Sequence, residues 1–162
     1  FLEIVDRGTR HDAPLDLAAL RDRERLTTLD GIETVCWIGG RLAEALAHAH
    51  QSGVLHRDVK PANVLINRYG RPLLADFNVS HRSDEHTDSI GGTIAYMAPE
   101  HLEAFLQPGK VPVDHRADLF SLGVVLYELL TGQLPYPTVR TTSREELARL
   151  VEELRQPVPP LS

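Results

Sequence analysis

Residues 56–63 read His-Arg-Asp-Val-Lys-Pro-Ala-Asn, and this polar stretch decides how the rest of the chain is interpreted. A second short motif, Asp-Phe-Asn, begins at Asp76. Between the two motifs lie the apolar runs 64–66 and 73–75, which are joined by an Asn-Arg-Tyr-Gly segment. Apolar runs on either side of a glycine-containing turn predict a hairpin of small strands. The hairpin would bring Asp76 back toward the first motif.

The composition is that of a globular domain that can bury a hydrophobic core. The 162 residues are 42% hydrophobic and 25% charged, and 23 acidic against 17 basic side chains give a net charge of -6. This modest negative charge carries no basic stripe, so a nucleic-acid partner is not expected. Cys36 is the single cysteine, which excludes an internal disulfide and a Cys-rich zinc site and favours a reducing, cytoplasmic location. The apolar run 119–130 is too short and too interrupted to span a membrane.

Helix signals occupy much of the remaining chain. Asp30 and Glu33 can form a capping box, after which apolar residues recur at helical spacing until Gly53 supplies a left-handed stop. Residues 118–130 are apolar nearly all round, so this helix, capped by Asp118, is expected to run through the core. Four shorter elements are predicted: a polar helix at 14–25, an amphipathic helix at 143–154, and small strands at 1–5 and 54–56.

A third motif, Gly-Thr-Ile-Ala-Tyr-Met-Ala-Pro-Glu, occupies residues 92–100. In their order and spacing the three motifs resemble the catalytic loop, the metal loop and the end of the activation segment of the protein kinase family, serine/threonine branch. The resemblance covers the whole chain. It implies an α+β, protein-kinase-like fold with a mainly α-helical C-terminal lobe, short antiparallel β-hairpins and an N-terminal lobe that is largely absent. It divides this partial kinase domain, 1–162, into a hinge strand at about 1–8, a catalytic loop 56–63, an activation segment 76–100 and a buried helix 118–130.

The resemblance implies a serine/threonine protein kinase that transfers the γ-phosphate of ATP to protein Ser/Thr hydroxyls. Phosphoryl transfer spreads negative charge over the transferred group, so catalysis depends on positioning and charge neutralisation. Asp58 would accept or orient the proton of the attacking hydroxyl, and Lys60 would meet the transferred phosphate. Asn63 and Asp76 would offer oxygen ligands to Mg²⁺, an ion that needs few of them because it keeps phosphate and water. Taken singly, such residues are more often surface ion pairs or turn formers.

ATP would lie against the first strand and the hairpin. By resemblance, Ile4 and Val5 belong to a hinge strand whose backbone groups meet the edge of adenine. Leu65 matches the apolar floor beneath adenine, although plain strand packing explains it equally well. Lys60 and Asp76 would reach the phosphates of the nucleotide.

The same resemblance implies a phosphorylation switch. Arg57 would pair with a phosphate on the activation segment, where Thr87 and Ser89 are the preferred acceptors. Alternatively, these hydroxyls only solvate an exposed loop.

Other positions resemble structural residues of the family. Thr93 would touch the catalytic aspartate and lysine. Glu100 would pair with an arginine of a helix beyond residue 162, and Asp118 would hydrogen-bond the backbone of the 56–58 turn. His56 and Phe77 are interpreted as packing residues between that turn and the metal loop. The other histidines considered show no ligand spacing and are interpreted as surface or packing residues: His48, His50, His81, His86, His101 and His115.

Asn78 stands where the metal loop of the family normally has glycine. A glycine-rich loop, a strand lysine and its partner glutamate would all precede residue 1. The chain is therefore expected to be an interior fragment with little or no transfer activity alone. Two alternatives are left open: a catalytically silent, kinase-like binding or scaffold module, and a plain helical interaction domain, which leaves the motif spacing unexplained.

Overall fold

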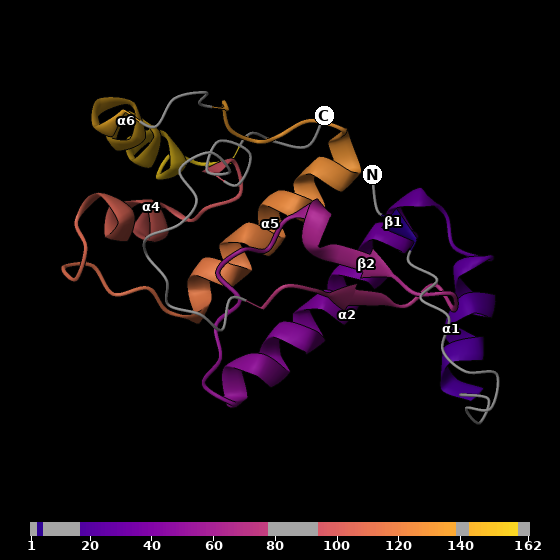
Figure 1. Cartoon of the computed structure of the whole chain (residues 1–162). Coiled ribbons are helices and arrows are strands. Elements are labelled where there is room, and N and C mark those ends of the chain that lie inside the picture. The colour runs from indigo at the N-terminus through magenta and orange to yellow at the C-terminus, as the bar shows by residue number, and fades with distance from the viewer. Residues whose placement is uncertain (1–2, 5–16, 78–93, 139–142, 159–162) are drawn as a thin grey trace.

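The computed structural model describes residues 3–4, 17–77, 94–138 and 143–158. Helices make up most of this part of the chain, and three short strands form one small sheet (Figure 1). This mainly helical architecture is the fold class expected from the sequence. In chain order the elements are β1 (Glu3–Ile4), α1 (Leu17–Leu26), α2 (Gly31–Gln51), the 3-10 helix η1 (Pro61–Asn63), β2 (Val64–Ile66), β3 (Pro72–Leu74), α4 (Pro99–Leu106), α5 (His115–Thr131) and α6 (Arg144–Leu154).

The sheet has the strand order β1-β2-β3 and combines a parallel with an antiparallel pairing. Strands β2 and β3 form the predicted hairpin, in which Val64 lies opposite Leu74 and Ile66 lies opposite Pro72. The side chain of Asn67 closes the turn, because its Oδ1 accepts hydrogen bonds from the backbone N–H groups of Tyr69 and Arg71. Strand β1 pairs with β2 in parallel, a pairing that the expectation of antiparallel hairpins did not include.

Local capping signals set the bounds of α2. Asp30 Oδ1 accepts a hydrogen bond from Glu33 N at 2.8 Å, and Asp30 N donates to Glu33 Oε2 at 3.1 Å, so the predicted capping box is present. Beyond the other end of the helix, Gly53 has a φ of 73°, the left-handed conformation that was expected to stop it. The predicted amphipathic helix is present as α6, with Ser143 as its N-cap.

The strand predicted at residues 54–56 is wrong. Val54 N donates to Ala49 O at 2.9 Å, so the chain leaves α2 through a helix-terminating turn and continues without strand pairing. The catalytic loop therefore follows α2 directly, and only its far end is joined to a strand, β2.

The predicted start of the buried helix is also wrong. Helix α5 begins at His115, because Asp114 caps it by accepting a hydrogen bond from Arg116 N at 2.9 Å. Asp118 lies inside the first turn of α5, so its carboxylate is available to partners outside the helix. The C-terminal end is as expected, with Gly132 in the left-handed conformation at a φ of 72°.

Two hydrophobic clusters hold the helices together. The first core joins α2 to α5 and the hairpin, and the second core lies mainly between α4 and α6 (Figure 1). Gly39 of α2 is buried where α2 meets α5, and a Cβ at this position would lie 2.9 Å from Leu126 Cδ2, so its lack of a side chain allows the close approach. The first core contains Ile38, Leu42, Leu46, Val59, Val64, Leu122 and Val125, and the second core contains Ile94, Leu102, Leu147, Leu150, Val151 and Leu154.

Helix α5 contacts both cores, as its apolar sequence predicts. Leu122 and Val125 belong to the first core, while Phe120 packs against the second. Among the described residues, no helix, α5 included, is long and apolar enough to cross a membrane.

Candidate active site

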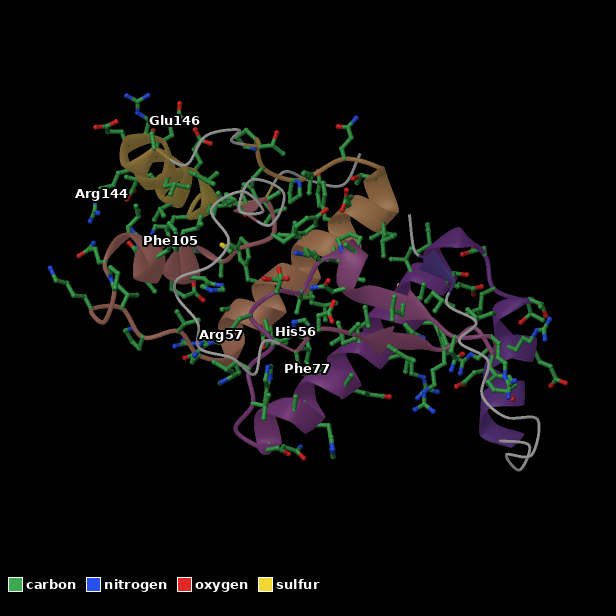
Figure 2. The ribbon with its side chains drawn as sticks, in the orientation of Figure 1. His56, Arg57, Phe77, Phe105, Arg144 and Glu146 are labelled. Atoms are coloured by element: carbon green, nitrogen blue, oxygen red, sulfur yellow. The ribbon has the colours of Figure 1, made fainter. Side chains whose placement is uncertain are left out.

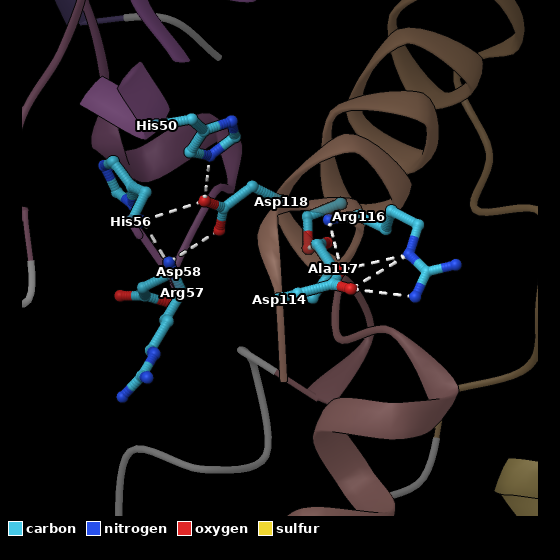
Figure 3. A network of polar contacts seen from close by, with 9 residues as sticks. His50, His56, Arg57, Asp58, Asp114, Arg116, Ala117 and Asp118 are labelled. Carbon is cyan, nitrogen blue, oxygen red and sulfur yellow. Dashed lines mark hydrogen bonds and ion pairs between the residues drawn. The ribbon is translucent and has the colours of Figure 1, made fainter. Parts of the chain in front are cut away.

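The catalytic loop begins with a backbone turn that is held by a buried carboxylate. Arg57 has a φ of 64°, in the left-handed region that residues other than glycine seldom adopt. Asp118 Oδ2 accepts a hydrogen bond from His56 N at 2.9 Å, and Asp118 Oδ1 accepts one from Arg57 N at 2.7 Å (Figure 3). Asp118 is 1% exposed, so these bonds face no competition from water. The hydrogen bonds expected between Asp118 and the 56–58 turn are thus present.

His56 joins this turn to the segment that follows β3. The imidazole is fully buried and lies 4.5 Å from the Phe77 ring between centroids, so the two residues pack together as expected (Figure 2). Its Nε2 is 2.9 Å from Ala75 O, which can only accept, while its Nδ1 accepts from Asp58 N at 3.3 Å. One neutral tautomer, with the proton on Nε2, satisfies both contacts.

Asp58, Lys60 and Asn63 converge as the motif predicts. Asn63 Nδ2 donates to Asp58 Oδ2 at 2.9 Å and to Asp58 O at 2.8 Å. Lys60 Nζ forms an ion pair with the same Oδ2 at 2.9 Å. The other carboxylate oxygen, Asp58 Oδ1, is buried and has no hydrogen-bond partner in the described part of the chain. One edge of the carboxylate is therefore fixed by the protein, and the other edge can accept a proton or a hydrogen bond.

The donor set fits a hard divalent cation. Because the amide nitrogen of Asn63 is bound to two oxygens of Asp58, the amide oxygen is the atom left for a ligand. Ala75 N donates to Asn63 O at 2.8 Å, which places Asp76 one residue from the Asn63 backbone. Asp76 is exposed and has a φ of 56°. An amide oxygen and a carboxylate from adjacent segments are the ligand types that Mg²⁺ prefers.

Two of the residues expected to contact adenine, Ile4 and Leu65, lie on the neighbouring strands β1 and β2. Ile4 pairs with Ile66, and Leu65, which is half-buried, pairs with Glu3. Val5 lies outside the described residues. The activation-segment positions Thr87, Ser89 and Thr93, and Asn78 before them, also lie outside the described residues.

At the end of the activation segment, Glu100 is half-buried in the first turn of α4. Tyr96 ties the segment just before α4 to α5, because its hydroxyl donates to Glu128 Oε2 at 2.8 Å. Burial, together with this hydrogen bond, raises the pKa of Tyr96 well above its ordinary value. The phenol therefore stays protonated and continues to donate.

His50 is a residue of the site that sequence reasoning missed. Its Nε2 lies 2.7 Å from Asp118 Oδ2, and its side chain is only 13% exposed (Figure 3). Interpreting it as a surface or packing histidine was therefore incomplete. The available signal was its position four residues after Leu46, on the buried face of α2, where a polar ring requires a partner.

Protein kinases are the class in which a helical lobe presents Asp, Lys and Asn on one loop, beside a hairpin that ends in a metal-binding Asp. A family model described as "Protein kinase domain" matches residues 15–159. The chain therefore belongs to the protein kinase domain family.

The chain is similar to named serine/threonine-protein kinases. A probable serine/threonine-protein kinase of Clostridium perfringens is 36% identical over 147 residues, which cover 83% of this chain and 20% of the relative. Serine/threonine-protein kinase PknJ of Mycobacterium tuberculosis is 36% identical over 169 aligned positions, which cover 99% of this chain and 25% of the relative. Aurora kinase A-B of Xenopus laevis is 33% identical over 141 residues, which cover 86% of this chain and 32% of the relative. The chain thus spans less than a third of the length of each of these relatives.

Proposed function

We propose that this chain is the large lobe of a serine/threonine protein kinase, which transfers the γ-phosphate of ATP to protein Ser/Thr hydroxyls. The observation that carries the proposal is the state of the Asp58 carboxylate: Asn63 and Lys60 hold one oxygen, and the other is buried without a partner in the described part of the chain. A carboxylate fixed in this way is suited to accept a proton from a positioned hydroxyl.

The chemistry follows from these contacts. The substrate hydroxyl oxygen attacks the γ-phosphorus, the bond to the bridging oxygen of ADP breaks, and the hydroxyl proton passes to Asp58 Oδ1. Lys60, which pairs with Asp58 in this structure, would neutralise charge on the transferred group. Positioning of this kind supplies most of the catalysis in phosphoryl transfer.

Asn63 and Asp76 would hold Mg²⁺, and Ile4, Val5 and Leu65 would flank adenine. When bound, the metal ion neutralises phosphate charge and orients the nucleotide. The chain's own contribution is the orientation of the Asn63 amide, which Asp58 fixes through two hydrogen bonds.

Regulation and location are further parts of the proposal. Arg57 is half-buried beside the catalytic aspartate, where a phosphate on Thr87 or Ser89 would reach it as an ion pair. Thr93 would contact Asp58 and Lys60, and Glu100 would pair with an arginine outside this chain. The protein would act in the cytoplasm on other proteins and not on nucleic acid.

Asp58→Asn tests this function in the protein that carries residues 1–162. The variant keeps the hydrogen-bonding shape but cannot take a proton, so the transfer rate should fall by about 100- to 10,000-fold while the circular dichroism spectrum is unchanged. Transfer of labelled phosphate from ATP to a generic protein substrate, with Mg²⁺ and with a chelator, is the measurement. Removing the metal should abolish transfer.

Asp114→Asn is the matched control, because Asn also caps helices well and Asp114 contacts Arg116 at the start of α5. It should retain full activity. A wild-type protein that binds ATP with the metal but transfers no phosphate, even in a single turnover, would favour the catalytically silent alternative.

A further inference from the structure

Two arginines of α6 reach across to α4, one from each end of α6. Arg155, the C-cap residue of α6, forms an ion pair with Glu103 of α4, at 2.6 Å between Nη2 and Oε1. Arg144, the first residue of α6, donates from Nη2 to the carbonyl oxygen of Leu106, the last residue of α4 (Figure 2). Helix α6 therefore holds α4 at two separate points.

Helix α4 depends on such contacts because it has few stabilising features of its own. It is 8 residues long, and an isolated helix of this length is marginal in water. Its N-cap residue, Ala98, makes no side-chain hydrogen bond to the first turn. The position of α4 is therefore set by the second core, which contains Leu102, and by the two arginines of α6.

The ion pair between Arg155 and Glu103 belongs to a network of three charges. Arg155 Nη1 also lies 3.2 Å from Oε1 of Glu152, one turn back on α6, so Glu152 holds the guanidinium group in place. The side chains of Arg155 and Glu103 are 48% and 25% exposed. A single ion pair at this exposure contributes little, whereas a network of charges with a defined geometry contributes more.

The position of α4 matters because the segment 94–98 leads directly into it. Ile94 and Ala98 are 1% and 0% exposed, and Ile94 belongs to the second core. Met97 N donates to Ile94 O at 3.1 Å, and Leu102 N donates to Ala98 O at 3.1 Å. The segment and the first turn of α4 are thus one hydrogen-bonded unit, which a shift of α4 would displace.

This unit borders the catalytic loop. Tyr96 packs against the first core, which contains Val59 of the loop. Burial, and then the charge of Arg57, lowers the pKa of His101 on α4, and the charge of Asp58 acts on it in the opposite direction, so α4 lies within electrostatic reach of the loop. A protein that presents a hydroxyl to Asp58 also covers the surface beside it, and this unit is part of that surface.

We propose that Arg155 is a positioning residue for the protein substrate, which, together with Arg144, fixes α4 and the segment 94–98 beside the catalytic loop. The effect on the substrate rests on the proposed kinase activity, whereas the fixed position of the segment stands without it. Arg155 is not a catalytic residue, because it acts only through Glu103 and α4. Its loss leaves the contacts of Asp58 in place, so substrate binding should weaken while the chemical step is unchanged.

The experiment measures kcat, the KM for a generic protein substrate and the KM for ATP in the protein that carries residues 1–162. Arg155→Gln should raise the KM for the protein substrate about three- to fivefold, the size of a partly exposed ion pair, with kcat and the KM for ATP unchanged. Glu103→Gln should have the same effect, and the two changes together should be no worse than either alone, because they remove one contact. The exchanged pair, Arg155→Glu with Glu103→Arg, should recover most of the loss.

Arg149→Gln is the matched control on the same helix. Arg149 is exposed and forms no ion pair in the described part of the chain, so its removal changes the charge of α6 equally without touching α4. Its KM values should equal those of the wild type. A similar rise in KM for Arg149→Gln and Arg155→Gln would mean that the substrate senses the charge of α6 and not its contact with α4, which would overturn the inference.

Hydrogen exchange provides a readout that is independent of activity. The backbone amides of Met97 and Leu102 should exchange faster in Arg155→Gln and recover in the exchanged pair, while those of α2 stay unchanged. If the wild type transfers no phosphate, the proposed function fails, whereas these amides still decide whether Arg155 fixes the segment. Unchanged exchange of these amides in Arg155→Gln, or an unchanged KM for the protein substrate in an active enzyme, would also overturn the inference.

Discussion

Arg57 and Asp76 both hold left-handed backbone conformations, with φ values of 64° and 56°. Neither is glycine, and each such conformation costs roughly 1–3 kcal/mol, so local contacts have to enforce it. At Arg57 the enforcing contact is the hydrogen bond from its N–H to Asp118. Beside Asp76, both backbone groups of Ala75 are bound, the N–H to Asn63 O and the carbonyl to His56 Nε2. The strain thus lies next to Asp58 and at Asp76, the two acids that we propose for proton transfer and for metal binding.

His101 should make the stability of the fold depend on pH. Burial, and then the charge of Arg57, lowers the pKa of this half-buried residue of α4. The unfolded chain keeps an ordinary histidine pKa of about 6.5 and therefore binds more protons than the folded chain just below that pH. The free energy of unfolding should rise with pH between the lowered folded pKa and about 6.5, and the stability should be lost as pH falls through that window. Urea unfolding at pH values of about 5.5 and 7.5 measures the difference.

His101→Gln separates this effect from those of the other histidines, because the variant cannot titrate at this position. It should lose less stability than the wild type on the same acidification. An equal loss in both proteins would mean that His101 does not carry the pH dependence.

The contacts of a single residue could be predicted where a short motif contains all the residues involved. They could not be predicted where the partner lies far away in the sequence. Asp58, Lys60 and Asn63 follow one another on a short loop, so their convergence was readable from spacing, and the described contacts agree with it. His50 was missed because the residue that gives it a role lies 68 positions away along the chain. Its position on the buried face of α2 shows that it requires a partner but not which one.

At the scale of elements, the bounds of helices follow from capping residues and glycines, which can be recognised directly in the sequence. The capping box of α2 and the glycines after α2 and α5 were predicted and are present. The start of α5 was misplaced because Asp114 and Asp118 are one turn apart and both can cap a helix. The strand expected at 54–56 was wrong although its apolar residues suit a strand. Val54 N donates to Ala49 O and His56 N donates to Asp118 Oδ2, and these two hydrogen bonds set the path of the chain.

Helix α2 contains two adjacent glycines whose substitution should have different effects. Gly40 is exposed with open space around it, so Gly40→Ala should stabilise the fold by about 0.5–1 kcal/mol through helix propensity. A Cβ at Gly39 would lie 2.9 Å and 3.0 Å from the two terminal carbons of Leu126, which must shift within the α2–α5 contact. Gly39→Ala is therefore expected to be at least about 1 kcal/mol less stable than Gly40→Ala. Equal free energies of unfolding for the two variants, from urea titrations, would contradict this account.

For the whole molecule, the two cores differ in how they connect the chain. The first core gathers residues from α2, the catalytic loop, β2 and α5, so it joins segments that are distant in sequence. The second core is built mainly by α4 and α6, which are also linked by an ion pair between Arg155 and Glu103 at 2.6 Å and lie together at one end of the molecule (Figure 1). Its described ties to α5 include the stacked rings of Phe120 and Tyr136. The pair of α4 and α6 is therefore placed to open as a unit while the first core stays folded.

Native-state hydrogen exchange with one leucine removed from each core tests this division. Leu46→Ala and Leu150→Ala each remove a side chain that is at most 2% exposed, which should cost about 2–5 kcal/mol. If α4 and α6 open on their own, Leu46→Ala should lower the protection of amides in α2 and leave those in α6 unchanged, because the first core stays folded during that opening. Leu150→Ala should lower both, since the contact it removes is lost in the partial opening and in global unfolding alike. Equal losses in α2 and α6 for Leu46→Ala would show that the lobe unfolds as one cooperative unit.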